Sequence, residues 1–203
     1  GLVSFNIEGV HGHDLSSLLN DRGIAIRAGD HCTQPLHDRL DIPGSARASF
    51  YVYNTRADVD RLLDVVDSAR DDLDAYLASD RYHDLVSDHY HHPRNPGALT
   101  DPTFVKSSEE TTCGDDGEFH VAIADGRIEA IAFESRSCAV SRAVASLLSE
   151  HLEGMSVEAV ADLDGYVASE LDGQYPDLRR ECVEGPEDVI REAAREYVQK
   201  NSA

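Results

Sequence analysis

The sequence is poor in lysine, which occurs only at Lys106 and Lys200. Its 18 basic residues face 39 acidic ones, so the formal net charge is -21. A field of this sign repels nucleic acid and anionic membrane surfaces, and we expect neither as a partner. Acidic, lysine-poor surfaces also suit a salt-rich cytoplasm, where ions screen the self-repulsion. The composition therefore suggests a halophilic protein; the alternative is an acidic surface that docks a basic partner.

Long apolar runs and closely spaced cysteines are also lacking. No uninterrupted apolar run reaches the roughly 18 residues of a membrane-spanning helix. The chain opens at Gly1 on a strand-like alternation, without an initiator Met or a basic leader, and reads as a segment entered part-way through a fold. The cysteines are Cys32, Cys113, Cys138 and Cys182. Their wide spacing argues against a secreted disulfide framework and for the cytoplasm.

Periodicity divides the chain into two blocks, with a boundary near residues 76 to 80 that gives domains of 1–78 and 79–203. The first block has a mixed α/β pattern, with strands predicted at 2–8, 24–26 and 48–53 and helices at 13–22 and from 55 onwards. The second has an α+β pattern, with an antiparallel hairpin of 119–123 and 128–133 and helices at 81–92, 139–153, 156–170 and 186–199.

Cys32 is the candidate nucleophile of the first block. A reactive thiol needs partial exposure and nearby positive charge, and Arg27, His31 and His37 surround Cys32 in the sequence. A buried structural cysteine is an equally good interpretation from the residues alone.

A resemblance favours the reactive thiol. Three stretches carry it, at residues 4–14, 23–35 and 46–55. In order and spacing they resemble the C-terminal part of SufS-type cysteine desulfurases, pyridoxal-phosphate enzymes of the aminotransferase class V fold.

This resemblance covers about residues 2–70 and implies that Cys32 forms a persulfide. It also implies that Arg47 holds the substrate carboxylate, for which a bidentate guanidinium is suited, with Arg27 nearby. The implied fold is the small C-terminal domain of a fold-type I pyridoxal-phosphate enzyme. The implied partners are an upstream desulfurase large domain and a second subunit, in a homodimer formed through the desulfurase.

The cofactor lysine of that family lies upstream of this region, and neither Lys106 nor Lys200 matches it. Pyridoxal phosphate is therefore expected in the full-length enzyme only, and the segment by itself is expected to be inactive.

The other three cysteines are candidate metal ligands. Cys113, Cys138 and Cys182, with Asp115 two residues after the first, make a set suited to tetrahedral zinc. Their spacing is not a CxxC pattern, so the residues alone leave a metal site undecided.

Four motifs of the second block resemble SufU and IscU scaffold-like proteins over about residues 81–198. They lie at residues 88–97, 112–115, 133–141 and 179–182. The resemblance implies the SufU/IscU-like α+β fold, an antiparallel sheet with helices, and a metal held by Cys113, Asp115, Cys138 and Cys182. It implies that Cys113 accepts sulfur and that SufBCD-like scaffold proteins are partners.

Histidines add one further candidate. His13 precedes Cys32 by 19 residues, and in desulfurases that work with SufU a histidine at this place can take over a zinc position. The resemblance therefore implies His13 as an exchange ligand; the alternative is a surface histidine that caps the following helix. We interpret His89, His91 and His92 as solvated or docking residues.

The expected function is sulfur mobilisation for iron-sulfur cluster assembly, with a persulfide on Cys32 passed to a thiol of the zinc site. One alternative is a scaffold on which a [2Fe-2S] cluster is assembled, since three cysteines and an aspartate can also hold iron. The other is a non-catalytic interaction module with structural zinc.

Overall fold

The computed structural model describes residues 1–108 and 116–201, which form two compact units. The first unit consists of residues 1–79, and the second of residues 80–108 and 116–201. Cys113 and Asp115 lie outside the described residues. Across the described part of the chain, every helix is too short or too polar to cross a membrane.

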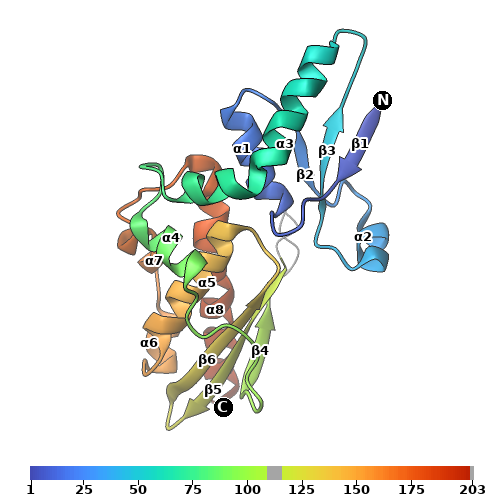
Figure 1. Cartoon of the computed structure of the whole chain (residues 1–203). Helices are drawn as coiled ribbons and strands as arrows, with labels where there is room; N and C mark the ends of the chain where they lie inside the picture. The colour runs from blue at the N-terminus through green and yellow to red at the C-terminus, as the bar shows by residue number, and fades with distance from the viewer. Residues whose placement is uncertain (109–115, 202–203) are drawn as a thin grey trace. The chain divides into compact units, whose positions relative to one another are not determined.

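The first unit is a three-stranded antiparallel sheet of order β1-β3-β2 with helices, the mixed α/β block that the sequence predicts (Figure 1). Its strands are β1 (Leu2–Phe5), β2 (Arg27–Gly29) and β3 (Ser45–Ser49). Its helices are α1 (Gly12–Asp21), α2 (Gln34–Leu40) and α3 (Arg56–Leu77). α1 packs against α3 and against the sheet.

Local signals explain the two longer helices of this unit. Leu15, Leu18 and Leu19 of α1 are buried, as their helical spacing predicts. α3 begins at a capping box, in which the Thr55 hydroxyl accepts the Asp58 N–H and the Asp58 carboxylate accepts the Thr55 N–H. These hydrogen bonds lower the pKa of Asp58.

All three strand predictions in the first unit need correction. β1 ends at Phe5 rather than at residue 8, β2 is Arg27–Gly29 rather than 24–26, and β3 is Ser45–Ser49 rather than 48–53. Tyr51, Val52 and Tyr53 are exposed and lie outside the sheet. Apolar aromatic and β-branched residues resemble a strand in sequence, whether or not a partner strand pairs with them.

The second unit joins an antiparallel sheet of order β4-β5-β6 to helices, the α+β architecture that the sequence predicts. The strands are β4 (Phe104–Ser107), β5 (Gly117–Ala124) and β6 (Arg127–Ser135). The helices are α4 (Asp84–His91), α5 (Ala139–Leu152), α6 (Val157–Ala161), α7 (Tyr166–Glu170) and α8 (Arg180–Asn201), with a 3-10 turn η1 (Asp177–Arg179) before α8. α5 is the core helix and packs on α4, α8 and β6.

The hairpin of the second unit confirms the strongest turn signal in the sequence. β5 and β6 flank Asp125 and Gly126, whose φ angles of 49° and 73° suit a tight two-residue turn.

Two helix predictions in the second unit are wrong. The single helix expected at 156–170 is two short helices, separated where Gly165 adopts a φ of 68°. α8 begins at Arg180 rather than at residue 186, so Pro186 lies inside the helix. Proline has no backbone N–H and usually lies in the first turn of a helix. The sequence therefore predicted that the helix starts at Pro186, which is too late in the chain.

Candidate functional site

Cys32 lies in the short loop between β2 and α2, and it is exposed. The Asp30 side chain folds over this loop, because its Oδ1 accepts the Cys32 N–H at 2.8 Å. The Thr33 N–H donates to the Asp30 carbonyl, also at 2.8 Å. His31 and Cys32 both have positive φ angles, 55° and 61°. Two consecutive residues in this region are unusual for side chains other than glycine, and such conformations cluster at functional sites.

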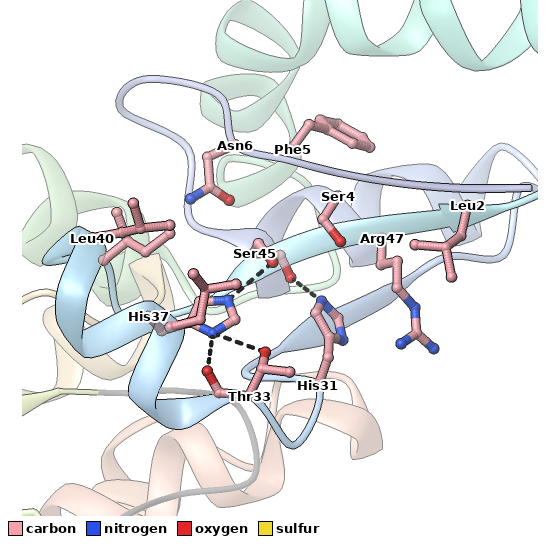
Figure 2. Close-up of a pocket in the computed structure, with 12 residues that line it drawn as sticks. Leu2, Ser4, Phe5, Asn6, His31, Thr33, His37, Leu40, Ser45 and Arg47 are labelled. Atoms are coloured by element: carbon pink, nitrogen blue, oxygen red, sulfur yellow. Dashed lines mark hydrogen bonds between the residues drawn. The ribbon is translucent and has the colours of Figure 1, made fainter.

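A pocket of about 380 Å³ lies beside this loop in the first unit (Figure 2). Its polar side is formed by His31, His37, Ser45 and Arg47. Apolar side chains complete it, among them Leu2, Phe5, Leu36, Leu40 and Ile42. The residues on either side of Cys32 line the pocket, whereas Cys32 itself does not.

Hydrogen bonds fix both histidines of the pocket. His31 donates its Nε2–H to the Ser45 carbonyl at 2.9 Å, which leaves Nδ1 with the lone pair. His37 is buried, with Nδ1 donating to the Thr33 carbonyl at 3.1 Å and Nε2 accepting from the Ser45 hydroxyl at 3.1 Å. Because both nitrogens of His37 are occupied within the unit, its role is structural.

Positive charge gathers at this pocket. Burial lowers the pKa of His31, and the charges of Arg47 and Arg27 lower it further against the opposing hydrogen bond to Ser45. His31 is therefore neutral near pH 7. The two arginines supply the fixed positive charge near the loop.

The two candidate arginines lie directly opposite each other on neighbouring strands, Arg27 on β2 and Arg47 on β3. Arg27 is exposed, whereas Arg47 is half-buried, and its Nε is buried without a partner among the described residues. Like charges in register are unfavourable, and an unpartnered guanidinium nitrogen needs an acceptor. Both features are satisfied by an anion such as a carboxylate.

The second unit brings two of the predicted metal ligands together. Cys138 caps the N-terminus of α5, where its sulfur accepts the Ser141 N–H at 3.5 Å. Cys182 lies in the first turn of α8. Both are buried, neither forms a disulfide, and their sulfur atoms lie within 4.8 Å of each other.

Zinc fits this pair. Two thiolates on one tetrahedral zinc, each with a Zn–S bond of about 2.3 Å, lie about 3.8 Å apart. The remaining two predicted ligands, Cys113 and Asp115, fall outside the described residues.

His13 lies in the first turn of α1 and is half-buried. The helix is capped not by His13 but by His11, whose Nδ1 accepts the His13 N–H at 3.2 Å. The capping role considered for His13 thus belongs to a residue that the sequence analysis did not single out.

Pyridoxal phosphate does not fit the residues present. The first 105 residues contain no lysine for its covalent attachment. Lys106 lies on β4, where its Nζ pairs with Glu196 at 2.9 Å and with Glu192 at 3.2 Å, and this pairing raises its pKa.

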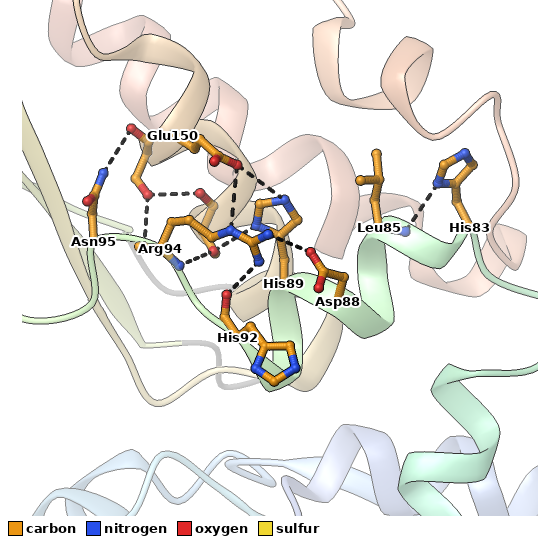
Figure 3. A network of polar contacts seen from close by, with 10 residues as sticks. His83, Leu85, Asp88, His89, His92, Arg94, Asn95 and Glu150 are labelled. Carbon is orange, nitrogen blue, oxygen red and sulfur yellow. Dashed lines mark hydrogen bonds and ion pairs between the residues drawn. The ribbon is translucent and has the colours of Figure 1, made fainter.

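One prediction about the histidines is wrong. His91 and His92 are exposed, as expected, but His89 is buried and has 2% of its surface accessible. Figure 3 shows it within a polar network around Arg94. His89 Nδ1 contacts Ser146 Oγ at 2.8 Å, and its Nε2 lies 3.7 Å from Glu150.

The same network holds the segment that follows α4. Ser146 Oγ also accepts the Arg94 N–H at 2.7 Å, so its own hydrogen is available to His89 Nδ1. The Arg94 guanidinium pairs with Asp88 at 2.6 Å and lies 3.7 Å from Glu150. The sequence around His89 does not show that this residue is buried, because its partners lie on α5, far along the chain.

The two units are similar to different families of known proteins. Residues 1–62 match the aminotransferase class-V family, and residues 81–203 match the NifU-like N terminal domain family. The cysteine desulfurase of Haloferax volcanii is 66% identical over 71 residues, which are 35% of this chain and 17% of that protein. A probable cysteine desulfurase of Halobacterium salinarum is 71% identical over 69 residues, 34% of this chain and 17% of that protein. The chain thus spans about a sixth of the length of these curated relatives.

Among solved structures, the N-terminal part of a nitrogen-fixing NifU-like protein from Brucella abortus is similar, with a TM-score of 0.48 and 18% identity. The match covers 60% of this chain and 96% of that one.

Proposed function

The chain belongs to the NifU-like N-terminal domain family, and we propose that it mobilises sulfur for iron-sulfur cluster assembly. One observation carries the proposal: a cysteine-desulfurase-like segment with an exposed Cys32 is joined to a NifU-like domain that holds a cysteine pair. We expect sulfur to pass from the thiol of the first unit to a thiol of the second. The proposed domains are residues 1–78 and 79–203, and the proposed location is the cytoplasm.

Cys32 is the proposed donor. Its exposure makes it accessible to another thiol, and Arg27 and Arg47 provide positive charge near its loop. Arg47 is proposed to bind the carboxylate of the sulfur-bearing substrate, which its unpartnered Nε supports. In the complete enzyme this substrate would be cysteine, as in the relatives named cysteine desulfurases.

Cys113 is the proposed acceptor. Its thiolate would attack the outer sulfur of the Cys32 persulfide. The sulfur-sulfur bond breaks, Cys32 leaves as a thiolate, and a persulfide forms on Cys113. This exchange needs neither an oxidant nor a reductant, because one persulfide replaces another.

Zinc is the proposed metal, held by Cys113, Asp115, Cys138 and Cys182. When bound, it would keep its cysteines as thiolates at neutral pH. His13 is proposed to replace Cys113 as a zinc ligand, and this proposal rests on the resemblance to desulfurases that work with SufU. The proposed partners are the upstream desulfurase large domain, SufBCD-like scaffold proteins, and a second subunit of a homodimer.

A scaffold for a [2Fe-2S] cluster is the second candidate, because two neighbouring thiols serve iron as well as zinc. Metal analysis and a visible spectrum after anaerobic purification separate the two. The sulfur-transfer proposal predicts about one zinc per chain, no charge-transfer bands, and loss of zinc in Cys182→Ala but not in the exposed-residue control His92→Ala. Stoichiometric iron with charge-transfer absorption, and no zinc, would favour the scaffold.

A further inference from the structure

Three potential metal ligands gather on the sheet of the second unit, away from the cysteine pair. Glu118 and His120 lie two residues apart on β5, and Glu134 lies on β6 directly opposite Glu118. One ligand atom from each lies within 4.8 Å of the other two. The register of the hairpin therefore places two carboxylates and an imidazole together.

The distances match those around one metal ion. His120 Nε2 lies 3.0 Å from Glu118 Oε1 and 3.7 Å from Glu134 Oε2. Ligands that lie about 2.1 Å from a common ion are about 3.0 Å apart at a right angle and about 3.4 Å apart at a tetrahedral angle. The distance to Glu118 matches the first value, and the distance to Glu134 exceeds the second by about 0.3 Å.

His120 is buried, and its Nε2 faces the two carboxylates. Its side chain is 9% exposed, and Nδ1 is buried without a partner among the described residues. A structural histidine such as His37 has both nitrogens hydrogen-bonded, whereas among the described residues the polar contacts of the His120 ring are made by Nε2, with Glu118 and Glu134.

The two carboxylates would attract a cation and are accessible from solvent. Glu118 and Glu134 face each other in register, an unfavourable arrangement that a cation between them would relieve. Their side chains are 34% and 54% exposed, so an ion can reach them from solvent. The Ser107 hydroxyl donates to Glu118 Oε2 at 3.2 Å and leaves Oε1 directed at His120, which is the kind of outer support that orients metal ligands.

We propose that Glu118, His120 and Glu134 bind a divalent first-row transition-metal ion. Two carboxylate oxygens and one imidazole suit ions such as Mn²⁺ and Fe²⁺, and three protein ligands leave further positions for water or another small ligand. The site is independent of the sulfur-transfer proposal, since none of its residues belongs to the cysteine set.

Mn²⁺ is the suitable probe, because thiolates prefer softer ions and the cysteine pair should not compete for it. The full chain is titrated with Mn²⁺, and the free ion is measured by its electron paramagnetic resonance signal. The titration is done in about 1 M KCl, where the Debye length of about 3 Å suppresses diffuse attraction to the net charge of -21.

The parent should bind one Mn²⁺ saturably, and His120→Gln and Glu134→Gln should each weaken binding at least about tenfold. Glu129→Gln is the matched control, because it removes the same charge from an exposed position on the same strand and should bind like the parent. Glu134 is exposed enough for its variant to fold even if His120→Gln does not. The absence of saturable binding in the parent, or equal binding by the parent, Glu134→Gln and Glu129→Gln, would overturn the proposal.

Discussion

His89 illustrates how a single buried side chain organises the second unit. Its imidazole is held between Ser146 and Glu150 on α5, and Ser146 in turn accepts the Arg94 N–H. Burial lowers the pKa of His89, the Arg94 charge lowers it further, and Glu150 and Asp88 act in the opposite direction. The folded state therefore favours the neutral ring.

This shift makes the stability of the second unit dependent on pH. The pKa of His89 is lower in the folded than in the unfolded protein, where it is near 6.5. The unfolded state binds the proton more readily, so the contribution of His89 is fully present above pH 6.5 and is lost as pH falls through the folded pKa. Urea unfolding at fixed salt, between pH 7.5 and 5, measures this loss.

His89→Asn should flatten the pH dependence of the unfolding free energy in that range, because asparagine can still accept from Ser146 but does not titrate. His92→Asn is the control, since His92 is exposed and should leave the pH dependence as in the parent. Equal pH dependence in His89→Asn and in the parent would show that another group is responsible.

At the scale of secondary structure, the sequence predicted those elements whose signals are local. The Asp125-Gly126 turn defined the hairpin, and the apolar stripe with its cap defined α3. β4 was missed because Phe104–Ser107 is short and depends on pairing with β5. The candidate sites follow the same division. Cys32, Arg27 and Arg47 are predicted by motif resemblance, and only the pairing of β2 with β3 shows that the two arginines face each other. The Glu118, His120 and Glu134 set depends on strand register, which the sequence does not specify.

The N-terminal cap of α3 should contribute to the stability of this helix. Thr55→Ala removes the hydroxyl that accepts the Asp58 N–H and should destabilise the helix by about 1 kcal/mol. Hydrogen exchange of the α3 amides measures this as a lower free energy of local opening.

Asp60→Ala is the matched control on the same helix. The Asp60 carboxylate is 4.0 Å from Arg56, and the two side chains are 63% and 94% exposed, so this ion pair should contribute little. Protection that is equally reduced in both variants, or in neither, would contradict the role assigned to the cap.

At the scale of the whole chain, a desulfurase-like segment and a NifU-like domain share one polypeptide. Covalent linkage raises the effective concentration of one thiol near another without any new contact between them. Linkage would therefore favour the proposed transfer between Cys32 and Cys113.

Isotope tracing can follow the proposed passage of sulfur from Cys32 to Cys113. An aromatic disulfide reagent first modifies the exposed Cys32, and heavy-isotope sulfide then displaces the aryl thiolate, which leaves a labelled persulfide on Cys32. Alkylation after increasing times, followed by mass spectrometry of the peptides, locates the label.

In the parent the label should leave Cys32 and appear on Cys113, and in Cys113→Ala it should stay on Cys32. In His13→Ala it should also stay on Cys32 while bound zinc is retained. Cys32→Ala, treated identically, should show no label on Cys113. A label that never leaves Cys32 in the parent, or that reaches Cys113 equally in Cys32→Ala, would contradict the transfer.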